Sequence, residues 1–506
     1  MYRFLSAVFF LLAGYYVLQA QEVKKIQLVN ADVVDYDEYT LGKDIKRLRG
    51  NVQFSHENAL LSCDSAIFNT KLNNVYAYSN VEINQGDTVQ LFGDSIRYFG
   101  NTKIAEVRSR VNLVHGKANL TTDSLNYDRN TNIAYYFNWG TIRDKENTLV
   151  SEWGYYYATP KDFIAINKVI LTNPRYRMIS DTLKYNVDNE TAFFNGPTTI
   201  TSDSNLIYCE NGWYNTQTEQ SRYSKNAYLK SKSQTLRGDS LFYDRNKGHG
   251  VSWGNVEIKD TVEHMMLNGQ YGEYFEEPEK AMMTDSALYR NVDGVDTLYM
   301  HADTLRMLTL GDTANPYKFI MGWYHVRTYR YDMQSDCDSL TYSLQDSVMR
   351  MFIHPVIWFE KHQLTAENIV LFTKNNKPHM IDLLNSSFII SDEDSLRYNQ
   401  LKGKNMRGFF EGNQLRKVEI KGNSQSIYYA KEDSTVIGVN QAECSNMDIY
   451  MIENEIEEIV FHTKPDATMY TPKEKSPIEM RLKNFMWYDY LRPKSNLDIF
   501  RRAATL

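Results

Sequence analysis

The amino-acid sequence predicts an all-β fold in which short two-stranded repeats stack into an elongated, solenoid-like array. Three observations predict it: a six-residue pattern that recurs, a constant spacing between its copies, and turn-forming residues between short alternating segments. The composition agrees, because 37 Tyr and 23 Phe among 506 residues favour pleated, half-buried surfaces. With 42% hydrophobic and 24% charged residues, the chain has the apolar side chains that a long core needs and does not resemble a disordered protein.

The recurring pattern consists of a small residue, an acid, Ser or Thr, an apolar residue, any residue and Tyr. Its clearest copies are Gly93–Tyr98, Thr122–Tyr127, Ser180–Tyr185, Gly238–Tyr243 and Cys337–Tyr342. The acidic positions, which we call the anchors, fall at residues 94, 123, 152, 181, 210 and 239, so 29 residues separate each anchor from the next. Equal spacings in succession indicate a repeat array rather than separate globular domains.

A second pattern lies between the anchors. The segments Gly50–Phe54, Ser79–Ile83 and Gly254–Ile258 alternate apolar and polar residues with the period of a half-buried strand. Turn formers such as Asp128–Asn132 separate the two patterns. Each repeat therefore consists of two strands and two turns, and it must stack on its neighbours to bury its apolar face.

The N-terminus differs in composition from the array. Arg3, the apolar stretch Phe4–Val17 and the small residue Ala20 are typical of a cleaved signal peptide, with a membrane anchor as the alternative. Beyond residue 345 the spacing loosens, and prolines interrupt it after residue 464. The expected segments are a signal peptide over residues 1–20, a first array over residues 21–345, a second array with longer repeats over residues 346–475, and a C-terminal tail or cap over residues 476–506.

Three of the four cysteines occupy the same place in different repeats. Cys63, Cys209 and Cys337 each directly precede an acidic anchor position. Equivalent positions on different repeats lie too far apart for disulfide geometry, so we expect free, inward-packed thiols.

The sequence contains no recognisable motif for catalysis. It lacks a His-Glu-x-x-His pair and a Gly-x-Ser-x-Gly elbow, and Gly248–Gly250 does not open a helix. We therefore expect no enzyme activity, no catalytic residues, no metal and no cofactor. The formal charge of −7 argues against a nucleic-acid partner. The anchors have two interpretations: calcium or carboxylate chemistry, or hydrogen bonds to the nearby backbone that fix a bend at a strand start.

The repeated Gly-Asp-Ser-Leu-x-Tyr-Asp and Gly-Asn-Val-x-Ile segments, between Val23 and Pro472, resemble the OstA-like, LptA-type lipopolysaccharide-transport family, which includes the N-terminal periplasmic domain of LptD. The resemblance implies an elongated β-jelly-roll whose apolar groove carries acyl chains, and a role in outer-membrane assembly. It implies lipopolysaccharide or a related lipid as ligand, transport components of both membranes as partners through end-strand addition, and a periplasmic location, with or without association with the outer membrane. A homo-oligomer is left open. This chain has many more repeats than the short bridge proteins of that family.

An apolar stripe follows the repeat and has two interpretations. Its residues either pack a dry core or line a groove for acyl chains; periodicity alone favours the core, and the resemblance favours the groove. The groove candidates are Ile96, Tyr98, Leu125, Tyr127, Leu183, Tyr185, Leu241 and Tyr243. Basic residues near the N-terminal edge either meet anionic head groups or guard a solvated edge strand; they are Lys24, Lys25, Lys43, Lys46, Arg47 and Arg49. A non-lipid scaffold of the cell envelope and a carbohydrate-active solenoid remain as alternative functions.

Overall fold

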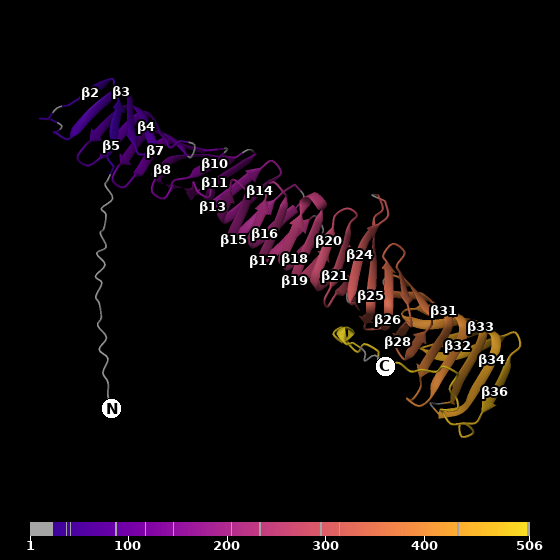
Figure 1. Ribbon diagram of the computed structural model, residues 1–506. Coiled ribbons are helices and arrows are strands. Elements are labelled where there is room, and N and C mark those ends of the chain that lie inside the picture. Colours follow the sequence, from indigo (N-terminus) through magenta and orange to yellow (C-terminus); the bar gives the residue numbers. More distant parts are fainter. Residues whose placement is uncertain are drawn as a thin grey trace, which may run out of the picture. The chain divides into compact units, whose positions relative to one another are not determined.

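In the computed structural model the described residues form 36 strands, two short 3-10 turns and no α-helix (Figure 1). Among these residues, none of the helical segments has the length and apolar character that a membrane crossing requires. The predicted signal peptide lies outside the described residues. The all-β, repeat-built fold is confirmed. The structure describes residues 24–502 apart from residues 37, 41, 87–88, 117, 145, 204, 232–233, 294–295, 313, 376 and 433–434.

The chain divides into two compact units. The first unit contains the residues up to Pro174 together with Lys184–Asp188, and the second contains Arg175–Leu183 and the residues from Asn189 onward. The strands that begin before Arg175 are β1 (Gln27–Asn30), β2 (Val33–Asp35), β3 (Ile45–His56), β4 (Ala59–Asn69), β5 (Asn74–Asn84), β6 (Gln90–Phe99), β7 (Ile104–His115), β8 (Ala118–Asp128), β9 (Ile133–Tyr136), β10 (Gly140–Asp144), β11 (Asn147–Ser151), β12 (Trp153–Tyr157) and β13 (Asp162–Asn173).

The remaining elements continue the same alternation of strand and turn, and β14 has residues in both units. They are β14 (Tyr176–Asn186), β15 (Thr191–Thr201), β16 (Asn205–Asn215), β17 (Gln220–Ser231), β18 (Gln234–Asp244), η1 (Arg245–Lys247), β19 (His249–Asp260), β20 (Met265–Phe275), β21 (Lys280–Thr284), β22 (Leu288–Asp293), β23 (Asp296–His301), β24 (Thr304–Leu310), β25 (Tyr317–Arg330), β26 (Met333–Ser343), β27 (Val348–Phe352), β28 (Val356–Phe359), β29 (His362–Thr365), β30 (Asn368–Lys374), β31 (Lys377–Asp392), β32 (Tyr398–Glu411), β33 (Gln414–Glu432), β34 (Thr435–Ile452), β35 (Glu455–His462), β36 (Asp466–Tyr470) and η2 (Asp498–Phe500).

Most strands bend near their middle. In β5 the antiparallel register with β6 shifts between Tyr78 and Val81. Ser79 and Asn80 have φ values of 61° and 49° there, a left-handed conformation that Asn tolerates better than most residues. Such a bulge turns the strand, so that Ala77 before it and Val81 after it both point into the interior, with 0% and 1% exposure. Each strand thereby contributes one half to each of two walls around a shared core.

The acidic anchors hold these bends from the neighbouring strand. The amide of Asn80 donates to Asp64 at 2.7 Å, and the amide of Asn255 donates to Asp239 at 3.0 Å. These contacts favour the structural interpretation of the anchors, but the partners are side-chain amides and not the backbone groups that were expected. The position of the anchor also differs from the expectation. Asp239 lies inside β18 rather than at a strand start, because the strand continues through the bend.

The cysteines are interior, as expected. Cys63, Cys209, Cys337 and Cys444 are buried and form no disulfide. Burial raises the pKa of the Cys63 thiol to about 11, so this thiol stays protonated at neutral pH. These cysteines therefore pack as small apolar side chains. The limits proposed for the two arrays, at residues 345 and 475, stay predictions.

The bend gives a direct test of the anchor contacts. Gly254 has φ +68°, and a Cβ there would lie 2.3 Å from the carboxylate of Asp239. We expect Gly254→Ala to lower the free energy of unfolding by about 2–3 kcal/mol, through backbone strain and displacement of the anchor. Gly412→Ala is the control, because Gly412 has φ +55° with nothing within 4 Å of its added Cβ. It should cost only about 1 kcal/mol in chemical denaturation. Equal losses would contradict a steric role for the anchor.

Candidate functional site

The tyrosine that ends each anchor pattern recurs near the ends of β6, β8, β12, β14, β16 and β18. We call Tyr98, Tyr127, Tyr156, Tyr185, Tyr214 and Tyr243, which are 29 residues apart, the tyrosine column. Their spacing places each ring at the edge where the two walls of the fold approach one another. Whether each hydroxyl finds a partner on the opposite wall decides whether the interior is closed at that level.

In the first unit the hydroxyls of these tyrosines reach side chains on the opposite wall. The hydroxyl of Tyr98 lies 2.5 Å from Nδ1 of His56. The Tyr127 hydroxyl lies 3.2 Å from the Gln85 side-chain oxygen and 3.1 Å from that of Asn132 in the next turn, and it shares its proton between them. Tyr185 donates to the carboxylate of Asp144 at 2.9 Å. The hydroxyl of Tyr156 also contacts the ring of His115. The partners on the opposite wall lie 41 or 42 residues before their tyrosines, and these bonds latch the two walls together.

The latch at Tyr98 is the most elaborate. Arg129 donates to the Tyr98 hydroxyl at 2.6 Å and to Asn58 at 2.9 Å. Nε2 of His56 lies 2.9 Å from the carbonyl of Lys24, so the imidazole donates there and accepts the Tyr98 proton at Nδ1. Burial, with a smaller effect of Arg129, lowers the pKa of His56 below 6.5, despite the opposing bond to Lys24. The neutral imidazole is thus the form that fits.

The candidate residues of the first unit lie in this closed interior. Ile96, Tyr98, Leu125 and Tyr127 are 0–4% exposed, and Tyr185 is 6% exposed. The space beside Tyr98 amounts to about 10 Å³, which admits at most a water molecule. The side chains of this part of the stripe therefore pack against one another in this structure. Arg49, one of the basic edge residues, pairs with Asp35 at 2.7 Å on the surface.

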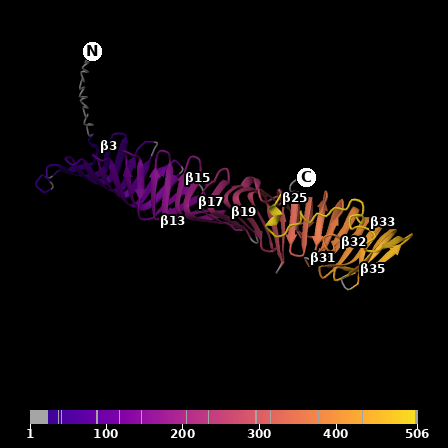
Figure 2. The same ribbon diagram turned by 90° about the horizontal axis from the view of Figure 1, so that it is seen from below.

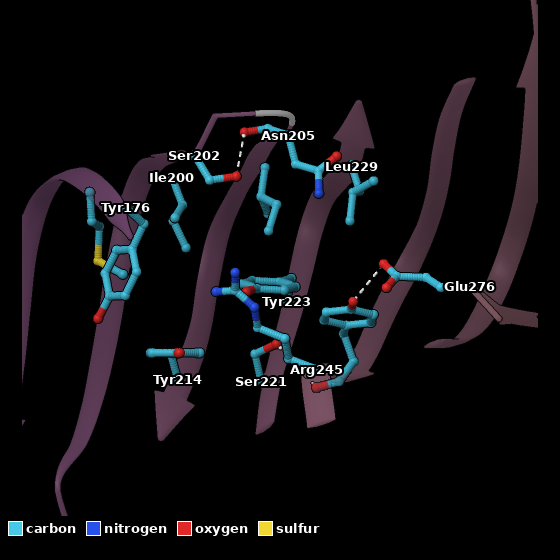
Figure 3. A pocket seen from close by; sticks show the side chains of 13 residues that line it. Tyr176, Ile200, Ser202, Asn205, Tyr214, Ser221, Tyr223, Leu229, Arg245 and Glu276 are labelled. Carbon is cyan, nitrogen blue, oxygen red and sulfur yellow. Dashed lines mark hydrogen bonds between the residues drawn. The ribbon is translucent and has the colours of Figure 1, made fainter. Parts of the chain in front are cut away.

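In the second unit the same column borders a cavity of about 320 Å³ (Figure 3). A second cavity of about 90 Å³ adjoins it, and the two share Tyr223, Leu229 and Tyr243 among their lining residues. The larger cavity lies at the lower end of the range of small-molecule pockets, about 300–1,000 Å³. It is lined by Tyr176, Met178, Ile200, Ser202, Asn205, Ile207, Tyr214, Ser221, Tyr223, Leu229, Tyr243, Arg245 and Glu276.

The tyrosines of this section do not latch the walls. Tyr243 donates to Glu276 at 2.7 Å, 33 residues later rather than 41 or 42 residues earlier, and burial raises its pKa. Tyr214 packs edge-on against Tyr176, with ring centroids 5.4 Å apart. The Tyr176 hydroxyl is buried and has no hydrogen-bond partner among the described residues. Burial raises the pKa of Tyr176, so its hydroxyl remains a neutral donor.

The charged groups of the cavity lie at its border. Arg245 begins the turn η1, and Figure 3 shows its guanidinium beside the ring of Tyr223, with Glu276 farther along the same cavity. A guanidinium presents a fork of donors that suits carboxylate and phosphate groups. A cavity with aliphatic and tyrosine side chains, polar groups and a cation at its border can accept an amphiphile whose acidic group remains near solvent.

The structure brings some of the predicted residues to this cavity and not others. Tyr243 lines it and Leu241 lines only the smaller cavity beside it, whereas Leu183 is fully buried. Sequence reasoning missed Tyr223, Leu229 and Arg245. The 29-residue spacing of the tyrosine column could have identified Tyr214. Arg245 follows the anchor pattern as an ordinary turn residue, and no feature of the neighbouring sequence distinguishes it.

The latches predict an unequal response to loss of a hydroxyl. Tyr98→Phe leaves Arg129 and His56 without their buried partner, and we expect it to cost about 2 kcal/mol of folding stability. Tyr176→Phe removes a buried hydroxyl without a partner and should change stability by less than about 0.5 kcal/mol. Chemical denaturation, with hydrogen exchange of β3 and β6, measures both. A neutral Tyr98→Phe would show that the latch does not hold the walls.

The latches also predict a dependence on pH. The folded pKa of His56 and that of His115 lie below 6.5, chiefly through burial. Their stabilising contribution is therefore complete above pH 6.5 and is lost as the pH falls through the folded values. The free energy of unfolding should decrease by up to about 1.4 kcal/mol per pH unit for each proton taken up. His56→Gln, which keeps one donor and one acceptor, should make this decrease smaller; an unchanged pH profile would contradict the assignment.

The comparisons with known proteins agree with this architecture. The model of the OstA-like protein family matches residues 23–181 and 183–294, more than half of the chain and all the residues that line the cavity of about 320 Å³. No curated protein matches the chain. The repeated bent strands, the interior bordered by the tyrosine column and this match place the chain in one family: it belongs to the OstA-like proteins.

Proposed function

We propose that this protein is a periplasmic lipopolysaccharide-binding bridge that takes acyl chains into its apolar interior and contributes to outer-membrane assembly. The observation that carries the proposal is the unlatched section of the interior, a cavity of about 320 Å³ that aliphatic, tyrosine and polar side chains line together with Arg245. Family membership supports the lipid class of the ligand. The export that this role requires rests on the predicted signal peptide.

Part of the mixed lining of the cavity suits an acyl chain. Met178, Ile200 and Ile207 supply aliphatic surface, and Tyr223 offers a ring face. Each methylene that leaves water for such surroundings contributes about 0.8 kcal/mol. Tyrosine adds a polar hydroxyl to an apolar ring, which suits the boundary between a chain and its hydrated head.

Arg245 suits the head group of such a lipid. A phosphate or carboxylate beside its guanidinium would gain a charge-assisted hydrogen bond while remaining near water. Glu276 lies along the same cavity and repels anions, so we expect the acidic group to settle at the Arg245 end. This arrangement orients the lipid with its chain inside and its head outside.

Movement along the protein needs energy and partners. The sequence has no nucleotide-binding motif, so a partner would supply the energy. At the two ends of the array, β1 and β2 pair only with β3, and β35 and β36 pair only with β34, among the described residues. A strand with an unpaired edge can accept a further strand from another protein, and transport components of the two membranes are the partners we expect.

The rival function is a scaffold of the cell envelope with a dry interior. The latched section of the first unit favours it, because Tyr98 and Tyr127 close that interior with hydrogen bonds to His56 and Gln85. Under the lipid proposal this section takes cargo only when its latches open. The two functions therefore differ in whether lipid ever contacts the interior.

Photo-crosslinking in cells tests the proposal. A photoreactive residue at Leu229, which lines the cavity, should capture lipopolysaccharide. The matched control is Tyr228, the preceding residue on β17, whose ring instead stacks on Tyr208 with centroids 5.4 Å apart. Arg245→Glu should reduce capture at Leu229 several-fold, because it replaces the attracting cation with a repelling anion. A folded protein that captures no lipid at Leu229 would reject the proposal and favour the dry scaffold.

The pair Tyr127 and Asn126 extends the test to the first unit. Tyr127 is fully buried and Asn126 is half-buried on the other side of the same strand. Capture at Tyr127 but not at Asn126 would show that the latches open during passage. Capture at Leu229 alone would confine bound lipid to the unlatched section.

A further inference from the structure

The residues after β36 return over the outer face of the second unit. Figure 2 shows this yellow segment running back across β33, β32 and β31 towards β25. Its side chains join a cluster separate from the main core, in which Met480 is 1% and Leu482 is 8% exposed. The sheet contributes Phe388, Ile390 and Tyr398 to this cluster. The segment therefore covers apolar side chains that point away from the interior.

The covered face contains a row of glutamines that alternate with apolar residues. Directly opposed pairs across five strands give the order Gln334, Trp358, Gln363, Ile390 and Gln400. The three glutamines are 0–3% exposed, and Trp358 is fully buried. We call this row the tail face. Buried amides need partners. Gln334 and Gln400 donate to carbonyls of the sheet itself, those of Arg330 and Tyr398, but the side-chain oxygens of all three glutamines accept from the tail.

Two of these glutamines hold the main chain of the tail in the same way. Gln400 donates to the carbonyl of Met480 at 2.8 Å and accepts from the N–H of Leu482 at 2.9 Å. Gln363 donates to the carbonyl of Met486 at 2.8 Å and accepts from the N–H of Tyr488 at 2.6 Å. Each amide thus clamps a carbonyl and the N–H two residues later, as a neighbouring β-strand would.

Further contacts make the face selective for this sequence. Phe485 packs on Tyr398 with ring centroids 5.2 Å apart, and Trp487 does so at the same distance. Arg492 donates to the side chain of Gln334 and to the carbonyl of Glu360, both at 2.7 Å. The clamps fix the main chain, and the ring and arginine contacts fix the register of the segment.

We propose that the tail face is a docking site for C-terminal segments as separate ligands, so that the segment of a second copy of this chain can replace the chain's own. The contacts that recognise the C-terminal segment lie on the tail face and not in the residues that link the segment to β36. The clamps, the ring contacts and the Arg492 contacts involve residues 480–492, whereas the linking residues 471–474 are exposed. The same sequence in another copy carries every group that the face binds.

Cutting the connection in the full chain tests this inference without lipid. A protease site inserted after Pro472 allows folded protein to be cut, and a labelled peptide of residues 476–502 is then added as competitor. We expect the cut segment to co-elute with the body at micromolar concentration and to be displaced by excess peptide. Immediate loss of the cut segment from the folded body would overturn the inference, because the face would then hold the tail only through its tether.

The clamps can be probed on the peptide alone, which leaves the fold untouched. Methylating the backbone nitrogens of Leu482 and Tyr488 removes the two N–H groups that Gln400 and Gln363 accept. This peptide should compete at least ten-fold more weakly than the unmodified one. Methylation at Ile478, which is 72% exposed, is the control and should compete normally. Equal competition by all three peptides would overturn recognition by the glutamine clamps.

Discussion

The bend in the middle of most long strands is the constraint on which the rest of the structure depends. A straight strand with this alternation would bury one face only against another layer, and the repeat contains no helix to provide one. The left-handed pair at Ser79 and Asn80 turns the strand, so that both of its halves face one interior. The anchors hold such bends from outside, where a carboxylate such as Asp64 keeps its hydration. This explains why acid and Asn recur with the period of the core although neither belongs to it.

Closure of the interior is decided separately, by polar pairs at the edges of the walls. In the first unit, buried hydroxyls such as those of Tyr98 and Tyr185 reach partners on the opposite wall. In the second unit, Tyr243 bonds to Glu276 instead, and a cavity lies beside it. One repeated backbone therefore provides closed and open sections without any change of fold. Because a hydrogen bond is a modest net stabilisation, a latch of this kind can open for a ligand that offers apolar contact in return.

The outer faces carry chemistry of their own. Along the tail face, the amides of Gln363 and Gln400 need partners as much as Trp358 and Ile390 need cover, and the tail supplies both. These amides bind main-chain groups from the face of the sheet, so they remain available although the backbone groups of the strands are already paired with each other. The second unit thus presents an inner surface suited to an amphiphile and an outer surface suited to a polypeptide, built from opposite sides of the same strands.

The sequence by itself determined the all-β class, the two-stranded repeat, the buried cysteines and the inward side of the stripe, because alternation and spacing are local properties of a chain. It did not determine which tyrosines latch. The partners of Tyr98 and Tyr127 lie 42 residues earlier, on the other wall, and only the folded strands bring them together. For the same reason the sequence did not indicate a role for Arg245, which borders a cavity that forms only in the folded chain. It did not indicate the tail face either. The contact between Gln400 and Leu482 spans 82 residues, and the contact between Gln363 and Tyr488 spans 125. Local pattern fixes the repeating unit, whereas the chemistry at its edges depends on contacts between distant repeats.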